Sequence, residues 1–163
     1  MVRFFVLALT VCFYLQPGFS FAQDVAKQLV GTWKLISSPT KFEGGDTIEA
    51  FGPNPKGRLV LTSDGHWIVI ITRADRGPAK NSDEKAALLD SMLAYSGKYT
   101  IDGDRIINRV DISHTEIFTG ALQTQTRFFS VEGDKLVLRT GLIASAFRPG
   151  QKLESILTWE RER

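Results

Sequence analysis

Cysteine and histidine are scarce in this chain of 163 residues, which holds one cysteine and two histidines. The single cysteine, Cys12, lies in an N-terminal segment that we expect to be removed, so the remaining chain has no thiol. Disulfides, thiolate metal sites and a cysteine nucleophile are therefore excluded for it. A third metal ligand beside two histidines would have to be Asp or Glu, and no spacing indicates one. We expect neither a metal nor a cofactor.

An excess of charge of one sign is also missing. The chain has 20 Lys and Arg against 18 Asp and Glu, and positive and negative residues are interspersed along its length. This balance gives no electrostatic reason to expect nucleic acid as a partner. The Gly-x-Ser-x-Gly elbow, a glycine-rich phosphate loop and the His-Glu-x-x-His motif are absent as well, which argues against the common hydrolase, nucleotide-binding and zinc-protease classes.

Only the N-terminus carries a long apolar run, from Phe4 to Leu15. A basic start precedes the run and small residues follow it up to Ala22, a pattern typical of a secretory signal peptide cleaved after that residue. A membrane-spanning helix needs roughly 18 apolar residues, and no small residue directly precedes Cys12 as a lipoprotein signal requires. We therefore predict a signal peptide at residues 1–22 and one exported domain at residues 23–163, periplasmic or secreted, without a stable membrane anchor.

The rest of the chain consists mainly of short β-type runs that are separated by glycine-containing turns. Asp64-Gly65, Asp102-Gly103 and Gly133 indicate compact hairpins, because glycine accepts the positive φ of primed turns. Eight or nine such strands are typical of an all-β sandwich or barrel. The predicted strands are residues 31–37, 58–62, 67–73, 97–101, 105–114, 123–131, 135–140 and 152–161, with 47–51 as a ninth. Trp67 to Ile71 is apolar on both faces, so we expect a covered outer face there.

One segment, residues 83–93, is typical of a helix instead. It is rich in Ala, Leu, Glu and Lys and places Ala86 and Leu89 at helical spacing, with Met92 or Leu93 as the next apolar position. Asn81 can cap it, with a glutamate three residues later. We predict one short amphipathic helix that lies across the sheet or closes one end of a barrel.

Hairpin register predicts which side chains share the inner face, because side chains alternate along a strand. The Asp102-Gly103 turn places one inward set on the two strands beside it, namely Tyr95, Tyr99, Ile106, Asn108, Val110, Ile112 and His114. A two-residue turn at Gly133 adds Arg127, Phe129 and Val131, together with Leu136 and Leu138, whereas a three-residue turn would reverse this second assignment.

Several segments together resemble the bacterial and fungal lipocalin-like domain family of small β-barrels. They are "LVGTWKLIS" (29–37), "FGPNPKGRLVLTSDGHW" (51–67), "TRADRGP" (72–78), "DEKAALLDSMLAYSGKY" (83–99), "RFFSVEGDKLVLRT" (127–140) and "LTWER" (157–161). The resemblance extends to lipocalins, in which an arginine near the last strand packs on the tryptophan of a Gly-x-Trp motif. It implies an antiparallel, lipocalin-like (calycin-type) barrel of eight to nine strands with one short helix and a cavity. Trp33 and Arg161 are the corresponding pair here.

The inward polar and aromatic residues are the candidate ligand site. We expect a small hydrophobic molecule bound by Trp67, Tyr95, Tyr99, Asn108, His114 and Arg127. Arg127 either binds an anionic group of a ligand or pairs with a buried acid. His114, with Glu116 on the same face, either acts on a ligand or is a hydrogen-bonded histidine of the rim.

Two other functions stay open at this stage. In one, the barrel is an isomerase or cyclase in which His114 or Tyr99 moves a proton. In the other, the core is filled and loops near Pro53 and Arg76 bind another protein. The oligomeric state is left open.

Overall fold

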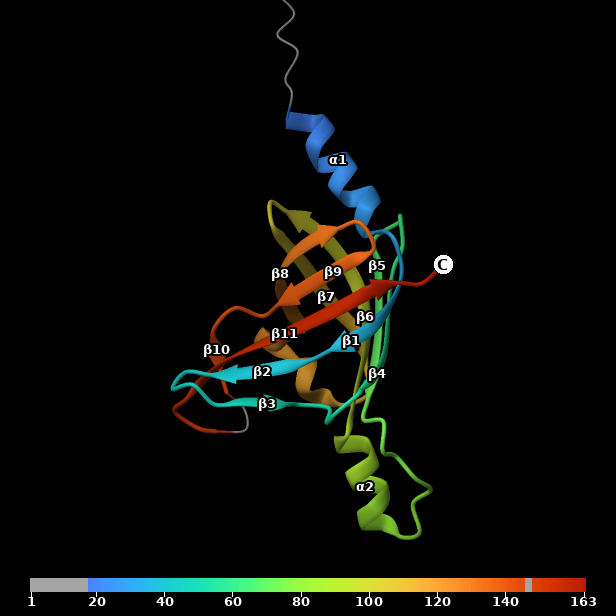
Figure 1. The fold of residues 1–163 in the computed structure, drawn as a ribbon, viewed down its shortest axis with the longest axis vertical. Coiled ribbons are helices and arrows are strands. Elements are labelled where there is room, and N and C mark those ends of the chain that lie inside the picture. The colour runs from blue at the N-terminus through green and yellow to red at the C-terminus, as the bar shows by residue number, and fades with distance from the viewer. Residues whose placement is uncertain (1–17, 146–147) are drawn as a thin grey trace, which may run out of the picture.

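The barrel wall consists of eight antiparallel strands. The strands are β1 (Gly31–Ser37), β4 (Lys56–Leu61), β5 (His66–Thr72), β6 (Met92–Asp102), β7 (Arg105–Ser113), β8 (Thr124–Glu132), β9 (Lys135–Arg139) and β11 (Lys152–Arg161). In this computed structural model, which describes residues 18–145 and 148–163, they follow one another around the wall in that order, and β11 also pairs with β1 (Figure 1). This pairing closes the barrel, so the predicted all-β, lipocalin-like barrel is confirmed.

Three small strands extend the wall to one side. They are β2 (Pro39–Phe42), β3 (Thr47–Glu49) and β10 (Ile143–Ala144). β2 and β10 both pair with β11, and β3 pairs with β2. β3 lies within the predicted run at residues 47–51. β2 and β10 were not predicted, because β2 is only four residues long and begins with a proline, and β10 has two residues.

One end of the barrel is closed by the C-terminal end of α1 (Gly18–Leu29) and by the residues that follow it at the start of β1. Leu29 is fully buried, and its carbonyl accepts a hydrogen bond of 2.9 Å from Trp33 Nε1. The Arg161 guanidinium lies 4.1 Å from the centroid of the Trp33 ring, and its Nη1 donates to the Val30 carbonyl at 2.8 Å. The predicted pairing of Trp33 with Arg161 is therefore confirmed.

Gly31 explains why the first residue of the Gly-x-Trp motif is a glycine. It has a φ of +145°, and a Cβ at this position would lie 2.5 Å from Arg161 Nη1. Any side chain here would occupy the space that the guanidinium needs to reach the tryptophan.

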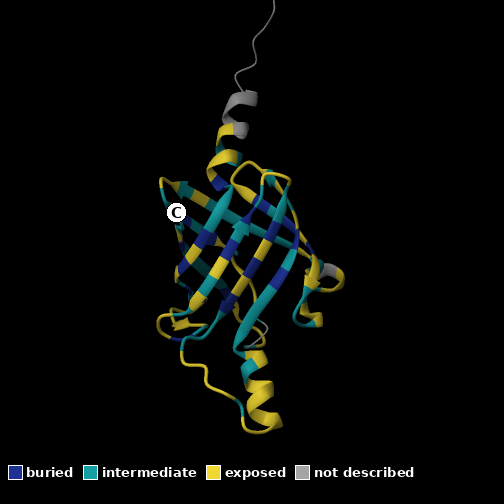
Figure 2. Cartoon of the chain, turned by 90° about the vertical axis from the view of Figure 1, so that its right-hand side faces the viewer, coloured by how far each residue is buried: buried dark blue, intermediate teal, exposed yellow. Residues whose placement is uncertain are grey.

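The predicted helix exists but is shorter than expected and lies elsewhere. α2 (Ser82–Asp90) begins after the predicted cap, since the Glu84 N–H donates to Asn81 Oδ1 at 2.9 Å. It projects from the end of the barrel opposite α1, and none of its nine residues is buried (Figures 1 and 2). The expectation that it covers the sheet or closes the barrel is wrong. The prediction counted Met92 among the apolar positions of the helix, but Met92 is the first residue of β6. Without it the helix has no continuous apolar face.

A β-bulge changes the inner face of β7 near its end. Ser96 is opposite Ile112, yet Gly97 is opposite Val110, so Asp111 is an extra residue on β7. Before the bulge the predicted alternation is confirmed, with Ile106, Asn108 and Val110 buried. After it the faces are exchanged, and Ile112 is 70% exposed. The prediction that Ile112 and His114 face inward is wrong for this reason.

The core is formed by the inner faces of the strands, along which buried and exposed residues alternate (Figure 2). Register at the Gly133 turn is that of a two-residue turn, with Phe129 opposite Leu138 and Val131 opposite Leu136. The largest buried side chains are those of Trp33, Trp67 and Trp159. The outer face of β5 is open, because Ile68 and Ile70 are about half exposed, which corrects the expectation of a cover there.

The predicted signal peptide can be placed only in part. Residues 1–17 lie outside the described residues, and the expected cleavage site after Ala22 lies within α1. No described helix is both long and apolar enough to cross a membrane.

Candidate functional site

The interior of the barrel at the α2 end carries a cluster of aromatic side chains around Tyr95. β6 begins at this end, and Tyr95 is its fourth residue, about 10 Å along the strand. Tyr95 is 6% exposed, and its ring stacks on Trp67 of β5, with the ring centroids 6.2 Å apart and the planes at 7°. Phe118, from the short 3-10 helix η1 (Glu116–Phe118), packs against the same ring at a centroid distance of 4.7 Å.

Arg127 brings a positive charge into this interior. It is the fourth residue of β8 and lies opposite Ile106, which is fully buried. Phe129, two residues later on the same strand, lies opposite the buried Leu138. Arg127 therefore lies on the inward face of β8. Its Nη1 donates to the Thr126 carbonyl at 2.9 Å, and its Nη2 donates to Gln125 Oε1 at 3.0 Å.

The charge of Arg127 also acts on the Tyr95 phenol. Burial raises the pKa of the Tyr95 phenol, and the positive charge of Arg127, together with hydrogen bonding from its guanidinium, acts in the opposite direction. At neutral pH the phenol is therefore protonated and can both donate and accept a hydrogen bond.

Asn108 is the most unusual residue of the interior. It is 1% exposed, and both polar atoms of its amide lack a hydrogen-bond partner in the described part of the chain. It lies opposite Tyr99 on one neighbouring strand and Gln125 on the other. The indole Nε1 atoms of Trp67 and Trp159 are likewise buried without a hydrogen bond of acceptable geometry to any described residue. Such groups lose free energy on burial unless a ligand or water satisfies them.

Gly97 gives Asn108 its space. A Cβ at this position would lie 2.6 Å from Asn108 Oδ1 and 2.1 Å from the carbonyl oxygen of Arg109. Only a glycine therefore lets β6 and β7 approach closely at the bulge while the amide points inward.

The structure brings four of the six predicted ligand residues together: Trp67, Tyr95, Asn108 and Arg127 all face the interior. Tyr99 faces inward too, but its hydroxyl donates to the Thr62 carbonyl at 2.9 Å, near the Asp64-Gly65 turn at the α1 end. Burial raises the pKa of this phenol. Its hydrogen bond to the backbone keeps it apart from the cluster.

His114 lies outside the barrel, which corrects its place in the predicted inward set. Its N–H bonds to the Ala94 carbonyl, and its ring Nδ1 lies 3.0 Å from that oxygen and 3.2 Å from the Ala94 nitrogen. It shares the outer face with Ile112 because both follow the bulge. Glu116 is exposed on η1, and no ion pair joins it to His114 among the described side chains. The two groups considered for proton transfer, His114 and Tyr99, are therefore both absent from the cluster.

Sequence reasoning missed two members of the site. Gln125 is two residues before Arg127 on the same strand, so alternation alone could have placed it on the inner face. Phe118 follows the end of β7 in a segment with no periodic pattern, η1 and η2 (Gly120–Gln123), and no sequence signal indicates that it packs on Tyr95.

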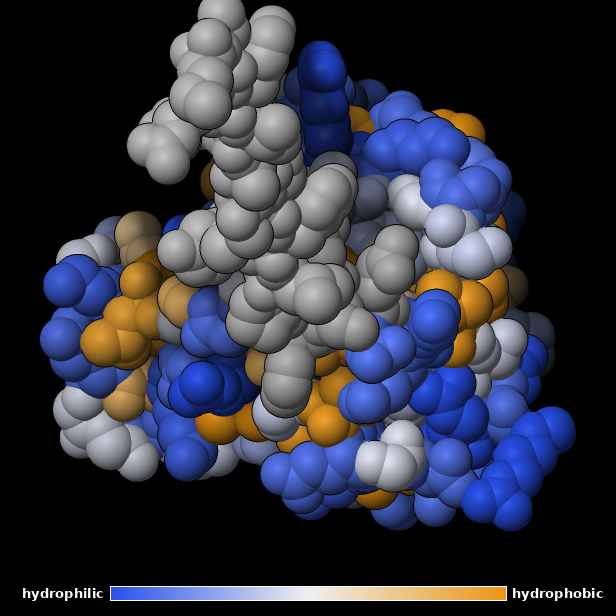
Figure 3. Space-filling model, turned by 90° about the horizontal axis from the view of Figure 1, so that it is seen from above, coloured by the Kyte–Doolittle hydropathy of each residue, from blue (hydrophilic) through white to orange (hydrophobic). Residues whose placement is uncertain are grey.

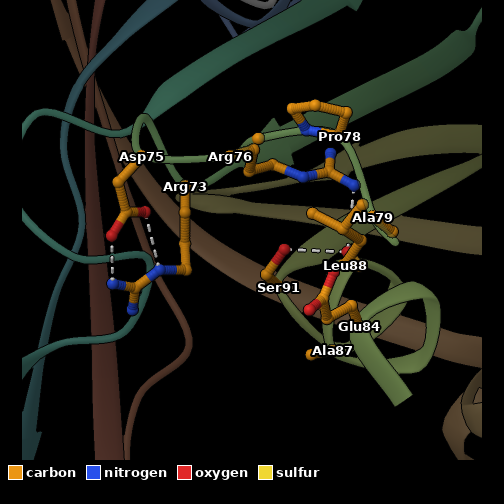
Figure 4. Close-up of a pocket in the computed structure, with 10 residues that line it drawn as sticks. Arg73, Asp75, Arg76, Pro78, Ala79, Glu84, Ala87, Leu88 and Ser91 are labelled. Carbon is orange, nitrogen blue, oxygen red and sulfur yellow. Dashed lines mark hydrogen bonds and ion pairs between the residues drawn. The ribbon is translucent and has the colours of Figure 1, made fainter. Parts of the chain in front are cut away.

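A hollow lies outside the barrel, between α2 and the loop that precedes it (Figure 4). Its volume is about 340 Å³. Arg73 binds Asp75 through two hydrogen bonds of 3.0 and 2.8 Å, and Arg76 Nη2 donates to the Leu88 carbonyl at 3.0 Å. The hydrogen bond from Arg73 lowers the pKa of the Asp75 carboxyl. These charged groups already bind one another or the backbone, so few of their hydrogen-bonding atoms are free to bind a ligand in this hollow.

A further hollow of about 330 Å³ lies beside the end of β7, where His114 and Glu116 line it together with Phe118. Viewed from the α1 end, hydrophilic residues cover most of the visible described surface, with smaller hydrophobic areas between them (Figure 3). Within residues 18–145 and 148–163, no three His, Asp or Glu side chains come together in a way that could hold a metal ion.

Comparison with known proteins gives one result that covers nearly the whole barrel. The family model described as a lipocalin-like domain matches residues 30–162. No curated protein matches the chain. The matched range begins just before β1 and ends just after β11, so it includes every strand of the wall.

Proposed function

Since the chain belongs to the lipocalin-like domain family, we propose that its barrel binds a small hydrophobic molecule in the interior at the α2 end. The observation that carries this proposal is the group of buried, unpaired polar atoms of Asn108 and Trp67, which lies in an interior lined mainly by apolar and aromatic side chains. Binding sites for small molecules have this composition, with apolar walls and a few polar groups that fix the orientation of the ligand.

The closure of the other end supports the same location. Leu29, Trp33 and Arg161 fill the α1 end, whereas Tyr95 lies only about 10 Å along its strand from the α2 end. Phe118 packs on the Tyr95 ring from η1, a segment outside the wall. A ligand therefore has a shorter path from the α2 end.

Export belongs to the same proposal. The apolar run at residues 4–15 and the small residues up to Ala22 support a signal peptide. We propose that the barrel binds its ligand in the periplasm or outside the cell.

Native mass spectrometry of the protein purified from the exported fraction of its host tests both parts. We expect the mass of the chain without residues 1–22 and one discrete adduct, which denaturing extraction releases as an apolar compound. A bare protein that also fails to take up the neutral dye Nile red would refute the binding function. It would favour a filled barrel that acts through its outer surface.

A variant pair connects the binding to the interior. In Asn108→Leu the unpaired amide is replaced by an apolar group of similar size, so the adduct should be lost or its affinity lowered about tenfold. Arg109→Leu is the matched control, because the neighbouring Arg109 is exposed on the outer face of the same strand. Equal adduct levels in both variants would show that Asn108 does not contact the ligand.

A further inference from the structure

Arg127 is a cation in the interior whose charge is not balanced by an acid. Its neighbours on the inner face are Tyr95, Ile106, Gln125 and Phe129, and none of them is negatively charged. Across the part of the chain that the structure describes, no Asp or Glu forms an ion pair with it. Its hydrogen-bond acceptors, the Thr126 carbonyl, the Gln125 amide oxygen and the Tyr95 hydroxyl, are all neutral.

Binding of an anion would stabilise a half-buried guanidinium that has only neutral neighbours. Taking a charge out of water costs free energy that hydrogen bonds to neutral oxygens offset only in part. Arginine has five N–H groups, and three of them are used by Thr126, Gln125 and Tyr95. Two remain for a ligand.

The unpaired groups nearby are mainly donors as well. Trp67 Nε1 and Asn108 Nδ2 can only donate hydrogen bonds, and Asn108 Oδ1 is the only unpaired acceptor beside them within the described cluster. The complementary ligand group is therefore one that accepts several hydrogen bonds and carries negative charge.

We propose that the interior site takes an amphipathic carboxylate, with its head group on Arg127 and its apolar body against the ring cluster of Tyr95, Trp67 and Phe118. This inference rests on the proposed binding function and specifies the chemical class of the ligand. A carboxylate is planar and singly charged, so it matches the planar guanidinium and balances its one charge. A phosphate dianion would bring a second charge for which the described interior has no partner.

A pair of probes that differ only in charge tests the inference. cis-Parinaric acid and its methyl ester share one apolar polyene, and fluorescence titration measures the Kd of each. At pH 7.5 we expect the acid to bind the unmodified protein about 10- to 100-fold more tightly than the ester, which corresponds to one or two charge-assisted hydrogen bonds.

Variants assign the selectivity to one residue. Arg127→Met keeps an unbranched apolar side chain and should remove the preference for the acid, while the Kd of the ester changes less than about twofold. Arg109→Met removes an exposed arginine from the outer face of β7 and should leave both Kd values unchanged. Arg127→Lys keeps the charge and should keep part of the preference.

The possible results separate the two proposals. Equal affinities of the acid and the ester for the unmodified protein would overturn the carboxylate inference without any variant, and binding of both would leave the proposed function intact. An equal loss of both probes in a folded Arg127→Met would also overturn it, since Arg127 would then only shape the cavity. Failure of both probes and of Nile red to bind the unmodified protein would refute the proposed function together with the inference.

Discussion

Replacing Gly31 by alanine should open the closed end of the barrel. The new Cβ would lie 2.5 Å from Arg161 Nη1, so the guanidinium must leave the face of Trp33 and the carbonyl of Val30. The φ of +145° adds backbone strain, because residues with a side chain rarely adopt it. We expect Gly31→Ala to lower the free energy of unfolding through both effects.

The magnitude follows from the contacts that are lost. A cation-π contact at a partly exposed site contributes about 0.5–2 kcal/mol, and a hydrogen bond from a charged group contributes about 1.5–3 kcal/mol. The side chain of Arg161 is 24% exposed, which places both contacts toward the middle of these ranges. With about 1 kcal/mol of strain, the total for Gly31→Ala is about 3–5 kcal/mol.

Urea unfolding followed by tryptophan fluorescence measures this loss. Gly45→Ala is the control for strain alone, because Gly45 has a φ of +106° and a Cβ there would meet nothing within 4 Å. The decisive comparison uses Arg161→Met, in which the guanidinium is already gone. In that background Gly31→Ala should cost only about as much as Gly45→Ala.

Additive losses would refute the reasoning. If Gly31→Ala destabilises the protein equally with and without the Arg161 guanidinium, the two residues are not coupled, and strain or a shift of β1 explains the effect. We expect instead a coupling energy of about 2–4 kcal/mol, at the upper end of the range for residues that are in direct contact.

Three further changes test other parts of the structure. Gly97→Ala should prevent folding or lower the urea midpoint severely, because its Cβ would lie 2.1 Å from the Arg109 carbonyl oxygen; a midpoint within about 0.5 M of the parent would contradict the close approach at the bulge. Asn108→Leu should raise the free energy of unfolding of the ligand-free protein by about 1–3 kcal/mol, since it removes buried groups without partners; calorimetry that shows a loss would mean that the amide is satisfied. Hydrogen bonds from the Thr62 hydroxyl and then from the His66 ring lower the pKa of the Asp64 carboxyl from 3.8 to about 2. The stability that this ionised carboxylate contributes is complete above pH 4 and is lost as the pH falls toward 2; Asp64→Asn should flatten the acid unfolding curve in that window, and an unchanged curve would exclude this carboxylate as a source.

Local sequence signals predicted the parts of the fold that depend on neighbouring residues. Glycine in the turns after Asp64, Asp102 and Glu132 fixed three hairpins and the register of Phe129 opposite Leu138. The contact of Trp33 with Arg161, which joins β1 and β11, is not a local signal and was predicted from the resemblance of the Gly-x-Trp segment to lipocalins.

The wrong predictions concern places where a regular pattern of apolar residues continues in the sequence although the strand or helix is interrupted in the structure. Val110-Asp111-Ile112 alternates between apolar and polar residues as an uninterrupted strand would, so nothing in it indicates that Asp111 is an extra residue. The apolar spacing of Ala86, Leu89 and Met92 likewise runs across the point where α2 ends and β6 begins. The absence of a partner for Asn108 depends on the positions of several strands at once, which a linear pattern does not contain.

The pairing of β11 with β1 also sets the order of events during folding. Arg161 contacts the carbonyl of Val30 across 131 positions of sequence, so the ring of strands cannot be completed until the last ten-residue strand has left the ribosome. Until then β1 and β9 have free edges that can pair with other chains. Contacts so distant in sequence are slow to form, and a chain with this topology should fold late and as one unit rather than from its N-terminus forward.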